Sequence, residues 1–345
     1  MRLYLHCGYH KTGSSFLQTV FAQKNEYLIK NGIYFPLARE DRNMLDAKIS
    51  PGNGIKLVYS LRESDEDYSL ELLKGWINEA NSKNCSSLLI SAEGLFHTFS
   101  KENTLKLLCD SCNKLGIDNI KCLLFFRDPI KHAFSVYKHR GKYGKILDFK
   151  NWINEDYETL NLTKDFLDIY NNFNISWHLR RYTSDSSQLI DIVFNDWLEL
   201  PPPEIVEEKR VNTSLTLSEI LALTEAKKLV SYYSIKEIYD SLIQLSNSEK
   251  AKDTVLNKYY SNVAYHSLSK HNEVINKVNS VLPDNEKLEF KDVDITSNSN
   301  KKQLSLSIAQ LNIFLYQIKK ASSFQRENFL FFKSKIKRVL SFFRK

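Results

Sequence analysis

The sequence predicts an α/β protein in which helices flank a parallel β-sheet, followed by a helical C-terminal extension. Short apolar segments recur at Arg2–Cys7, Ser86–Ser91 and Cys122–Phe126, as expected for strands that are covered on both faces. Each segment is followed by a polar turn and then by a stretch whose apolar residues have helical spacing. This alternation is typical of parallel sheets.

Length and charge suggest how the chain is divided. The 345 residues can bury a sizeable core, and we expect one domain over 1–283, a polar linker over 284–303 and a basic amphipathic helical tail over 304–345. Residues 301–345 hold eleven Lys or Arg and one acidic residue, so of the net charge of +7 the first 300 residues carry −3. The basic balance therefore belongs to the tail, and no nucleic-acid motif accompanies it, so we expect no nucleic-acid partner.

The cysteines and the N-terminus bear on the cellular compartment. Cys109 and Cys112 form an isolated C-x-x-C pair with no second pair to complete a zinc site, so buried thiols in a reducing compartment are expected. The chain shows no secretory leader pattern and no apolar run long enough to cross a membrane. These features predict a cytoplasmic protein, either free or peripheral on the cytoplasmic face of the membrane.

The first thirty residues form the predicted centre of the protein. The strand at Arg2–Cys7 runs into a loop that Gly8 and Gly13 bracket, and a helix is predicted from Phe16 to Lys30. In this order the loop's backbone N–H groups and the positive end of the helix dipole face the same point. The stretch is therefore predicted to bind a phosphate group.

The lysine of this loop distinguishes it from a nucleoside-triphosphate loop, in which Lys directly follows the second Gly. Here Ser14 follows Gly13, and Lys11 lies inside the loop. The stretch from His10 to Gln18 closely resembles the 5′-phosphosulfate-binding loop of sulfotransferases, which use 3′-phosphoadenosine 5′-phosphosulfate (PAPS). The resemblance assigns the following residues to that phosphosulfate: Lys11, Thr12, Gly13, Ser14, Ser15 and Phe16.

A second motif follows the apolar run that ends at Phe126. Asp128 is a natural helix N-cap and Pro129 a natural first helical residue, and Ser135 lies eight residues after Arg127. Arg127 alone would be interpreted as a surface ion pair. Together with Ser135, however, it resembles the 3′-phosphate-binding motif of sulfotransferases, in which an arginine fork and a hydroxyl share the phosphate.

The resemblance covers roughly residues 1–280 and is closest to bacterial sulfotransferases with a His-Lys-Thr-Gly loop. It implies a P-loop NTPase-like sheet wrapped by helices, PAPS as cofactor, 3′-phosphoadenosine 5′-phosphate (PAP) as product, and no metal. Arg210 and its neighbour Lys209 could close over the 3′-phosphate, or they could be two plain surface charges. Ser14 and Ser15 stand where two threonines are commoner, and both hydroxyls are kept.

Sulfuryl transfer also needs a cation at the leaving oxygen and a base for the acceptor. Lys11 is the candidate for the first role. Glu93 and His10 are the candidates for the second: Glu93 follows a predicted strand at the ligand-binding edge of the sheet, and His10 has the more suitable ordinary pKa. We favour Glu93.

The rest of the chain is predicted to be mainly helical. Residues 38–66 are expected to form an insertion with only short helices, and 175–182 the last strand. Longer helices are predicted over these ranges: 70–80, 104–115, 149–173, 187–198, 217–245 and 255–279.

The tail and the acceptor complete the expectations. Basic, aromatic-rich amphipathic helices bind anionic membranes, so residues 304–345 are predicted to do so; a helix packed on the body and a dimer contact are the alternatives. A membrane-bound tail favours a glycan or a glycolipid, such as a lipid-linked saccharide, as acceptor. The competing functions are a P-loop kinase-like phosphotransferase and a catalytically silent nucleotide-binding module. The oligomeric state is not predicted.

Overall fold

The computed structural model describes residues 1–37, 42–46, 50–142, 148–204, 215–246, 248–290 and 304–323. The chain forms two compact units that interleave along the sequence, whereas the predicted division runs in consecutive segments. Unit 1 comprises Met1–Asp128, Glu158–Val211 and His271–Glu289. Unit 2 comprises Pro129–Tyr157, Asn212–Lys270 and Phe290–Lys345.

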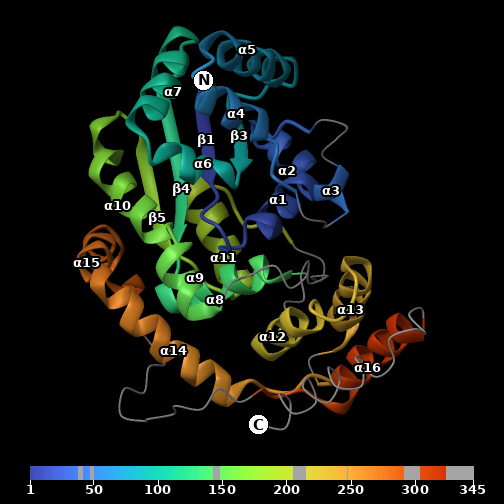
Figure 1. Ribbon diagram of the computed structural model, residues 1–345. Coiled ribbons are helices and arrows are strands. Elements are labelled where there is room, and N and C mark those ends of the chain that lie inside the picture. Colours follow the sequence, from blue (N-terminus) through green and yellow to red (C-terminus); the bar gives the residue numbers. More distant parts are fainter. Residues whose placement is uncertain are drawn as a thin grey trace. The chain divides into compact units, whose positions relative to one another are not determined.

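Unit 1 contains a five-stranded, entirely parallel sheet with the strand order β2-β3-β1-β4-β5, drawn as arrows in Figure 1. β1 is central, and its Leu5 lies opposite Ile90 of β3 and Cys122 of β4. The α/β prediction is confirmed. The strands are β1 (Arg2–Cys7), β2 (Ile33–Tyr34), β3 (Ser87–Ala92), β4 (Asn119–Phe126) and β5 (Ser176–Arg181).

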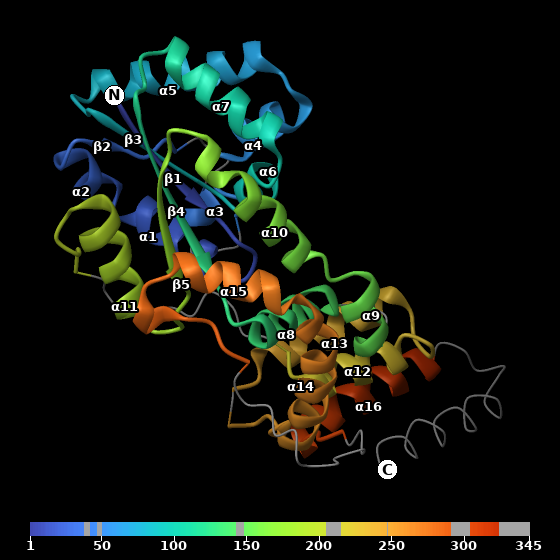
Figure 2. The ribbon, with the colours of Figure 1, turned by 90° about the vertical axis from the view of Figure 1, so that its left-hand side faces the viewer.

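Helices cover both faces of this sheet, with α1 and α11 on one side and α10 on the other (Figure 2). The predicted helix over 16–30 is divided at Lys24, the polar residue that interrupts its apolar stripe. The helices of unit 1 are α1 (Ser14–Gln23), α2 (Asn25–Lys30), α3 (Arg42–Leu45), α4 (Ile55–Glu63), α5 (Glu66–Ser82), α6 (Gly94–Phe99), α7 (Glu102–Lys114), α10 (Thr159–Ile169), η3 (Tyr170–Asn172), α11 (Ser186–Asp191), the π-helical η4 (Ile192–Leu198), α15 (Asn272–Val281) and η6 (Asp284–Glu286).

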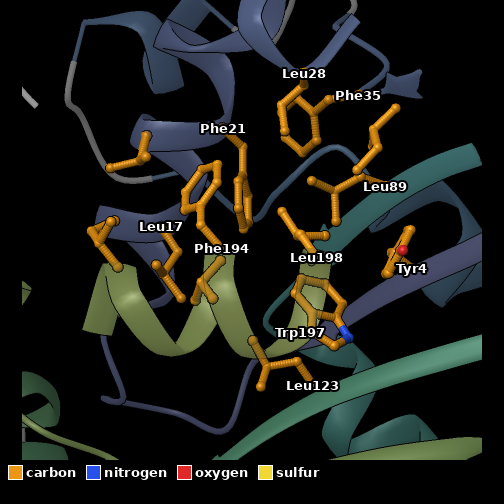
Figure 3. Close-up of a cluster of buried hydrophobic side chains, with 14 of the residues drawn as sticks. Tyr4, Leu17, Phe21, Leu28, Phe35, Leu89, Leu123, Phe194, Trp197 and Leu198 are labelled. Atoms are coloured by element: carbon orange, nitrogen blue, oxygen red, sulfur yellow. The ribbon is translucent and has the colours of Figure 1, made fainter. Parts of the chain in front are cut away.

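A hydrophobic core lies between the sheet and the helices α1 and η4 (Figure 3). It holds the first junction, the loop between β1 and α1, in place. Leu17 and Phe21 of α1 are fully buried there, beside Phe194 and Trp197 of η4. The edge of the Tyr4 ring meets the Trp197 ring at a centroid distance of 5.4 Å. Because β1 and α1 are buried in the same cluster, the loop between them is anchored at both ends.

Unit 2 is helical in its described residues. Within it α14 packs against α8 and α9, and α16 packs against α12 and α13. The predicted helix over 217–245 is two helices, because Ser231 caps a new one by accepting from the Ser234 N–H at 3.3 Å. The helices are α8 (Pro129–Arg140), α9 (Phe149–Glu155), α12 (Leu217–Ala226), α13 (Tyr232–Gln244), α14 (Thr254–Leu268) and α16 (Ile308–Ser323), with η5 (Ser269–His271) following α14.

The first part of the predicted tail packs within unit 2. Phe314 and Ile318 of α16 are buried, and the Gln310 side-chain amide donates to the Glu219 carboxylate at 2.7 Å. Over these residues the structure matches the alternative of a helix packed on the body. Residues 324–345 lie outside the described part, so membrane binding by them stays a prediction. No helix in the described ranges is both long and apolar enough to cross a membrane.

Candidate functional site

The loop after β1 lies against the end of β3. The Gly8 N–H donates to the Ala92 carbonyl at 3.1 Å. A Cβ at Gly8 would lie 2.6 Å from Glu93 Cα and 2.8 Å from Ser14 Oγ. Since real Cβ atoms do not come this close to other atoms, only glycine fits, and its small size brings Glu93 to the loop.

Two residues of the loop have left-handed backbone conformations. Lys11 has φ +63° and Gly13 has φ +79°, and positive φ is strained for any residue with a Cβ. Between them the buried Thr12 donates its hydroxyl proton to the Tyr9 carbonyl at 2.6 Å. The Thr12 hydroxyl therefore stabilises the loop's own turn, whereas the resemblance assigns it to the phosphate.

The N-terminus of α1 presents backbone donors. Gly13 is the N-cap and has no side chain to accept from them. The first bond of the helix is Leu17 N–H to the Gly13 carbonyl, at 3.0 Å, so the N–H groups of Ser14, Ser15 and Phe16 precede the intrahelical ladder. The Ser14 hydroxyl is buried and has no hydrogen-bond partner in the described part of the chain. The positive end of the helix dipole lies here as well.

Arg127 approaches this loop from the end of β4. Its Nη1 donates to the Lys11 carbonyl at 2.6 Å, and its guanidinium lies over the Tyr182 ring, 5.1 Å from the centroid. Tyr182 also lies against Gly13, where an added Cβ would be 3.1 Å from its Cε2 atom. Tyr182 was not among the predicted site residues. Its place at the carboxyl end of the last predicted strand was the available signal.

The two candidate bases lie next to each other. His10 Nδ1 is 3.9 Å from Glu93 Oε2. Burial raises the pKa of the Glu93 carboxyl, and the charge of Lys11 acts in the opposite direction. The structure thus brings together Lys11, Glu93 and His10 around one loop.

A buried polar layer underlies the loop. Gln18 lies one helical turn after Ser14, is fully buried, and has no hydrogen-bond partner for its side-chain amide among the described residues. A Cβ at Gly52 would lie 2.5 Å from the Gln18 Nε2 and 2.0 Å from the Ser91 carbonyl oxygen. His6 pairs through Nδ1 with the Ser91 hydroxyl at 2.8 Å. Sequence reasoning missed these polar residues, although the spacing of Ser14 and Gln18 could have indicated a shared helix face.

The described part of unit 1 does not contain two of the predicted site residues. Ser135 is a half-buried residue of α8 in unit 2, whereas Arg127 belongs to unit 1. Arg210 lies outside the described residues, as does Lys209. Their contacts with a 3′-phosphate stay predictions.

Comparisons with protein-family models, curated proteins and solved structures gave no match. In the described ranges, no three His, Cys, Asp or Glu side chains gather as potential metal ligands. The features that bear on function are therefore the loop, the α1 N-terminus and the charged side chains around them.

Proposed function

We propose that this chain is a sulfotransferase that moves a sulfuryl group from PAPS to a hydroxyl or amine of a glycan or lipid-linked saccharide. The observation that carries the proposal is the N-terminus of α1. There, uncapped backbone N–H groups and the buried, unpartnered Ser14 hydroxyl directly follow a loop that contains Lys11. Such a helix start favours an anionic group.

The residues of the first junction fit the 5′-phosphosulfate of PAPS, which supplies an activated sulfuryl group when bound. Ser14, Ser15 and Phe16 would hold the phosphate through their N–H groups, and Gly13 keeps the approach open. Arg127 would bind the 3′-phosphate. Its guanidinium has five N–H donors, so it can hold the Lys11 carbonyl at the same time.

The charged residues have distinct roles in the proposed reaction. The Lys11 ammonium stabilises negative charge on the oxygen that leaves the sulfuryl group. Glu93 accepts the acceptor's proton, and its raised pKa makes it a stronger base than an exposed carboxylate. His10 is the alternative base.

The pH dependence of the reaction tests the role of Glu93. Because Glu93 must be ionised, the rate should fall as pH drops through its pKa. In Lys11→Gln the residual rate should fall at a higher pH, since the charge that lowers the pKa of Glu93 has been removed. An unchanged acid limb would argue that another group is the base.

Calorimetric titration tests the nucleotide site directly. We would compare PAP with adenosine 5′-phosphate, which lacks the 3′-phosphate, on wild type, Arg127→Ala and the exposed control Lys106→Ala. Wild type and control should prefer PAP at least tenfold, and Arg127→Ala should lose most of this preference because the guanidinium–phosphate bonds are gone.

The ligand pair separates two effects of Arg127. If Arg127 only held the loop, both nucleotides would weaken equally and the preference for PAP would remain. ADP with Mg²⁺ is the third ligand: tighter binding of ADP with Mg²⁺ than of PAP would favour the kinase-like alternative. PAP binding without sulfation of any offered saccharide would favour the silent module.

A further inference from the structure

Arg62 is fixed against α6, the helix that follows the candidate base. At the end of α4, its Nε donates to the Thr98 hydroxyl at 2.9 Å and its Nη2 to the Gly94 carbonyl at 3.1 Å. Both acceptors are neutral and belong to α6, which begins directly after Glu93. The guanidinium is therefore held against α6 by two bonds that do not neutralise its charge.

His97 lies on the same short helix, one turn after Glu93. Its Nδ1 is buried and has no hydrogen-bond partner among the described residues. Burial lowers the pKa of His97, and so do the nearby positive charges of Arg62, Lys101 and His10; Glu158 has a smaller, opposite effect. Arg62 and Lys101, together with His10 when it is protonated, are thus close enough to act on one imidazole, and Glu158 acts in the opposite direction.

Such a cluster is costly unless an anion joins it, because like charges repel. In the described part of the chain no ion pair engages Arg62 or Lys101, and both residues are exposed. Glu93 lies 3.9 Å from His10, and its raised pKa weakens it as a counter-charge. Arg62 and Lys101 therefore have no ion-pair partner among the described residues, and a soluble anion would supply the missing counter-charge.

We infer that Arg62, His97 and Lys101 form an anion subsite for the acceptor, so the acceptor carries a carboxylate, phosphate or sulfate near the group to be sulfated. This inference rests on the proposed function, since Glu93 is taken as the base. The donor's phosphates are assigned to the α1 N-terminus and to Arg127. The proposed subsite belongs to other elements: Arg62 lies on α4, His97 on α6, and Lys101 is the N-cap of α7.

The test measures the pKa of His97 by NMR, with the resonance assigned by its loss in His97→Gln. The protein is saturated with PAP and titrated with inorganic sulfate. Sulfate at the subsite should raise the pKa of His97 by about half a unit or more, because an adjacent anion favours the imidazolium. In Lys101→Gln the half-saturating sulfate concentration should rise about threefold or more, since one cation is lost.

Controls separate local from general charge effects. Lys74→Gln removes an exposed lysine of α5 and should leave the sulfate response unchanged. Arg62→Gln, which keeps a hydrogen-bonding group, is the second variant. The inference is overturned if sulfate leaves the pKa of His97 unchanged, or if both cluster variants respond as wild type does.

Competition identifies the kind of anion. Glucuronate and glucose 6-phosphate should each displace sulfate from His97, and the tighter competitor distinguishes a carboxylate from a phosphate; glucose should have no effect. Equal displacement by glucose would overturn the inference. The same sulfate titration without PAP keeps the two proposals apart. If sulfate binds at His97 but PAP does not bind to the protein, the sulfotransferase proposal is contradicted and the anion subsite is not.

Discussion

The two strand-to-helix junctions of the candidate site are built by different means. Between β1 and α1, left-handed Lys11 and Gly13 and the tightly packed Gly8 shape the backbone itself. Between β4 and α8, neither Arg127 nor Asp128 has a positive φ, and the contribution to the site is the side chain of Arg127. The first junction presents backbone dipoles, and the second supplies a side-chain charge.

The two junctions are also linked. Arg127 donates to the carbonyl of Lys11, the strained residue of the first loop, and Tyr182 supports both the guanidinium and Gly13. A side chain of the second junction therefore stabilises the backbone of the first. Substitutions beneath or within the first loop should therefore lower the free energy of unfolding more than substitutions of Tyr182, whose ring supports Arg127.

The largest expected effect is that of His6, beneath the first loop, on the pH dependence of the free energy of unfolding. Burial lowers the pKa of His6 to about 4, so below its ordinary pKa of 6.5 the unfolded chain binds a proton that the folded chain excludes. The free energy of unfolding should therefore fall by about 3 kcal/mol between pH 6.5 and pH 4 from this residue. Urea unfolding of wild type and His6→Asn across this range measures the difference; parallel pH profiles would contradict it.

Gly8→Ala should destabilise the protein by about 2 kcal/mol, because the added methyl group meets the backbone of Glu93 and cannot be relieved by a rotamer change. Gly75→Ala in α5 is the control. Nothing lies within 4 Å of its Cβ, so alanine should instead stabilise that helix by up to about 1 kcal/mol. Thermal unfolding of the two variants should shift in opposite directions.

Gly13→Ala should cost about 1.5 kcal/mol through its positive φ and the contacts of its Cβ with Tyr182 and Leu189. Gly116 has a similar φ of +70°, and an added Cβ would have no neighbour within 4 Å. Gly116→Ala should therefore lower the free energy of unfolding through backbone strain alone. Equal losses of unfolding free energy in the two variants would mean that the Tyr182 contact contributes nothing.

The smallest effect is expected at Tyr182. Tyr182→Leu removes the ring beneath Arg127 and should lower the free energy of unfolding by about 0.5–1 kcal/mol. The affinity for PAP should fall by a similar free energy. Tyr182→Phe keeps the ring and should behave as wild type. If Tyr182→Phe loses as much affinity as Tyr182→Leu, the hydroxyl and not the ring is what matters.

Much of the fold of unit 1 could be predicted from local pattern. The apolar run at Cys122–Phe126 and the glycine-bracketed loop are signals contained in a few neighbouring residues, and both fall where predicted. Helix breaks were harder to place. The ends of α1 and α13 depend on single residues, Lys24 and Ser231, whose effect is weak against the helical periodicity around them.

The candidate site divides in the same way. The loop residues and Arg127 could be named because each belongs to a short motif. Arg62 could not, because it belongs to no motif. The contacts of Gln18, Tyr182 and Arg62 with Gly52, Gly13 and Gly94 could not be predicted either, since each pair is distant in sequence. The hydrogen bond from the Thr12 hydroxyl to the Tyr9 carbonyl could not be predicted either, because it depends on the conformation of the loop.

The sequence by itself determined the order of strands and helices and the glycines that let the loop form, since hydrophobic period and backbone freedom are local properties. Only the tertiary structure decided which strand ends meet. Parallel pairing of β1 with β3 and β4 places Glu93 and Arg127 on either side of one loop. The packing of α4 on α6 then places Arg62 beside His97. These juxtapositions arise from long-range burial, which the spacing of residues along the chain does not encode.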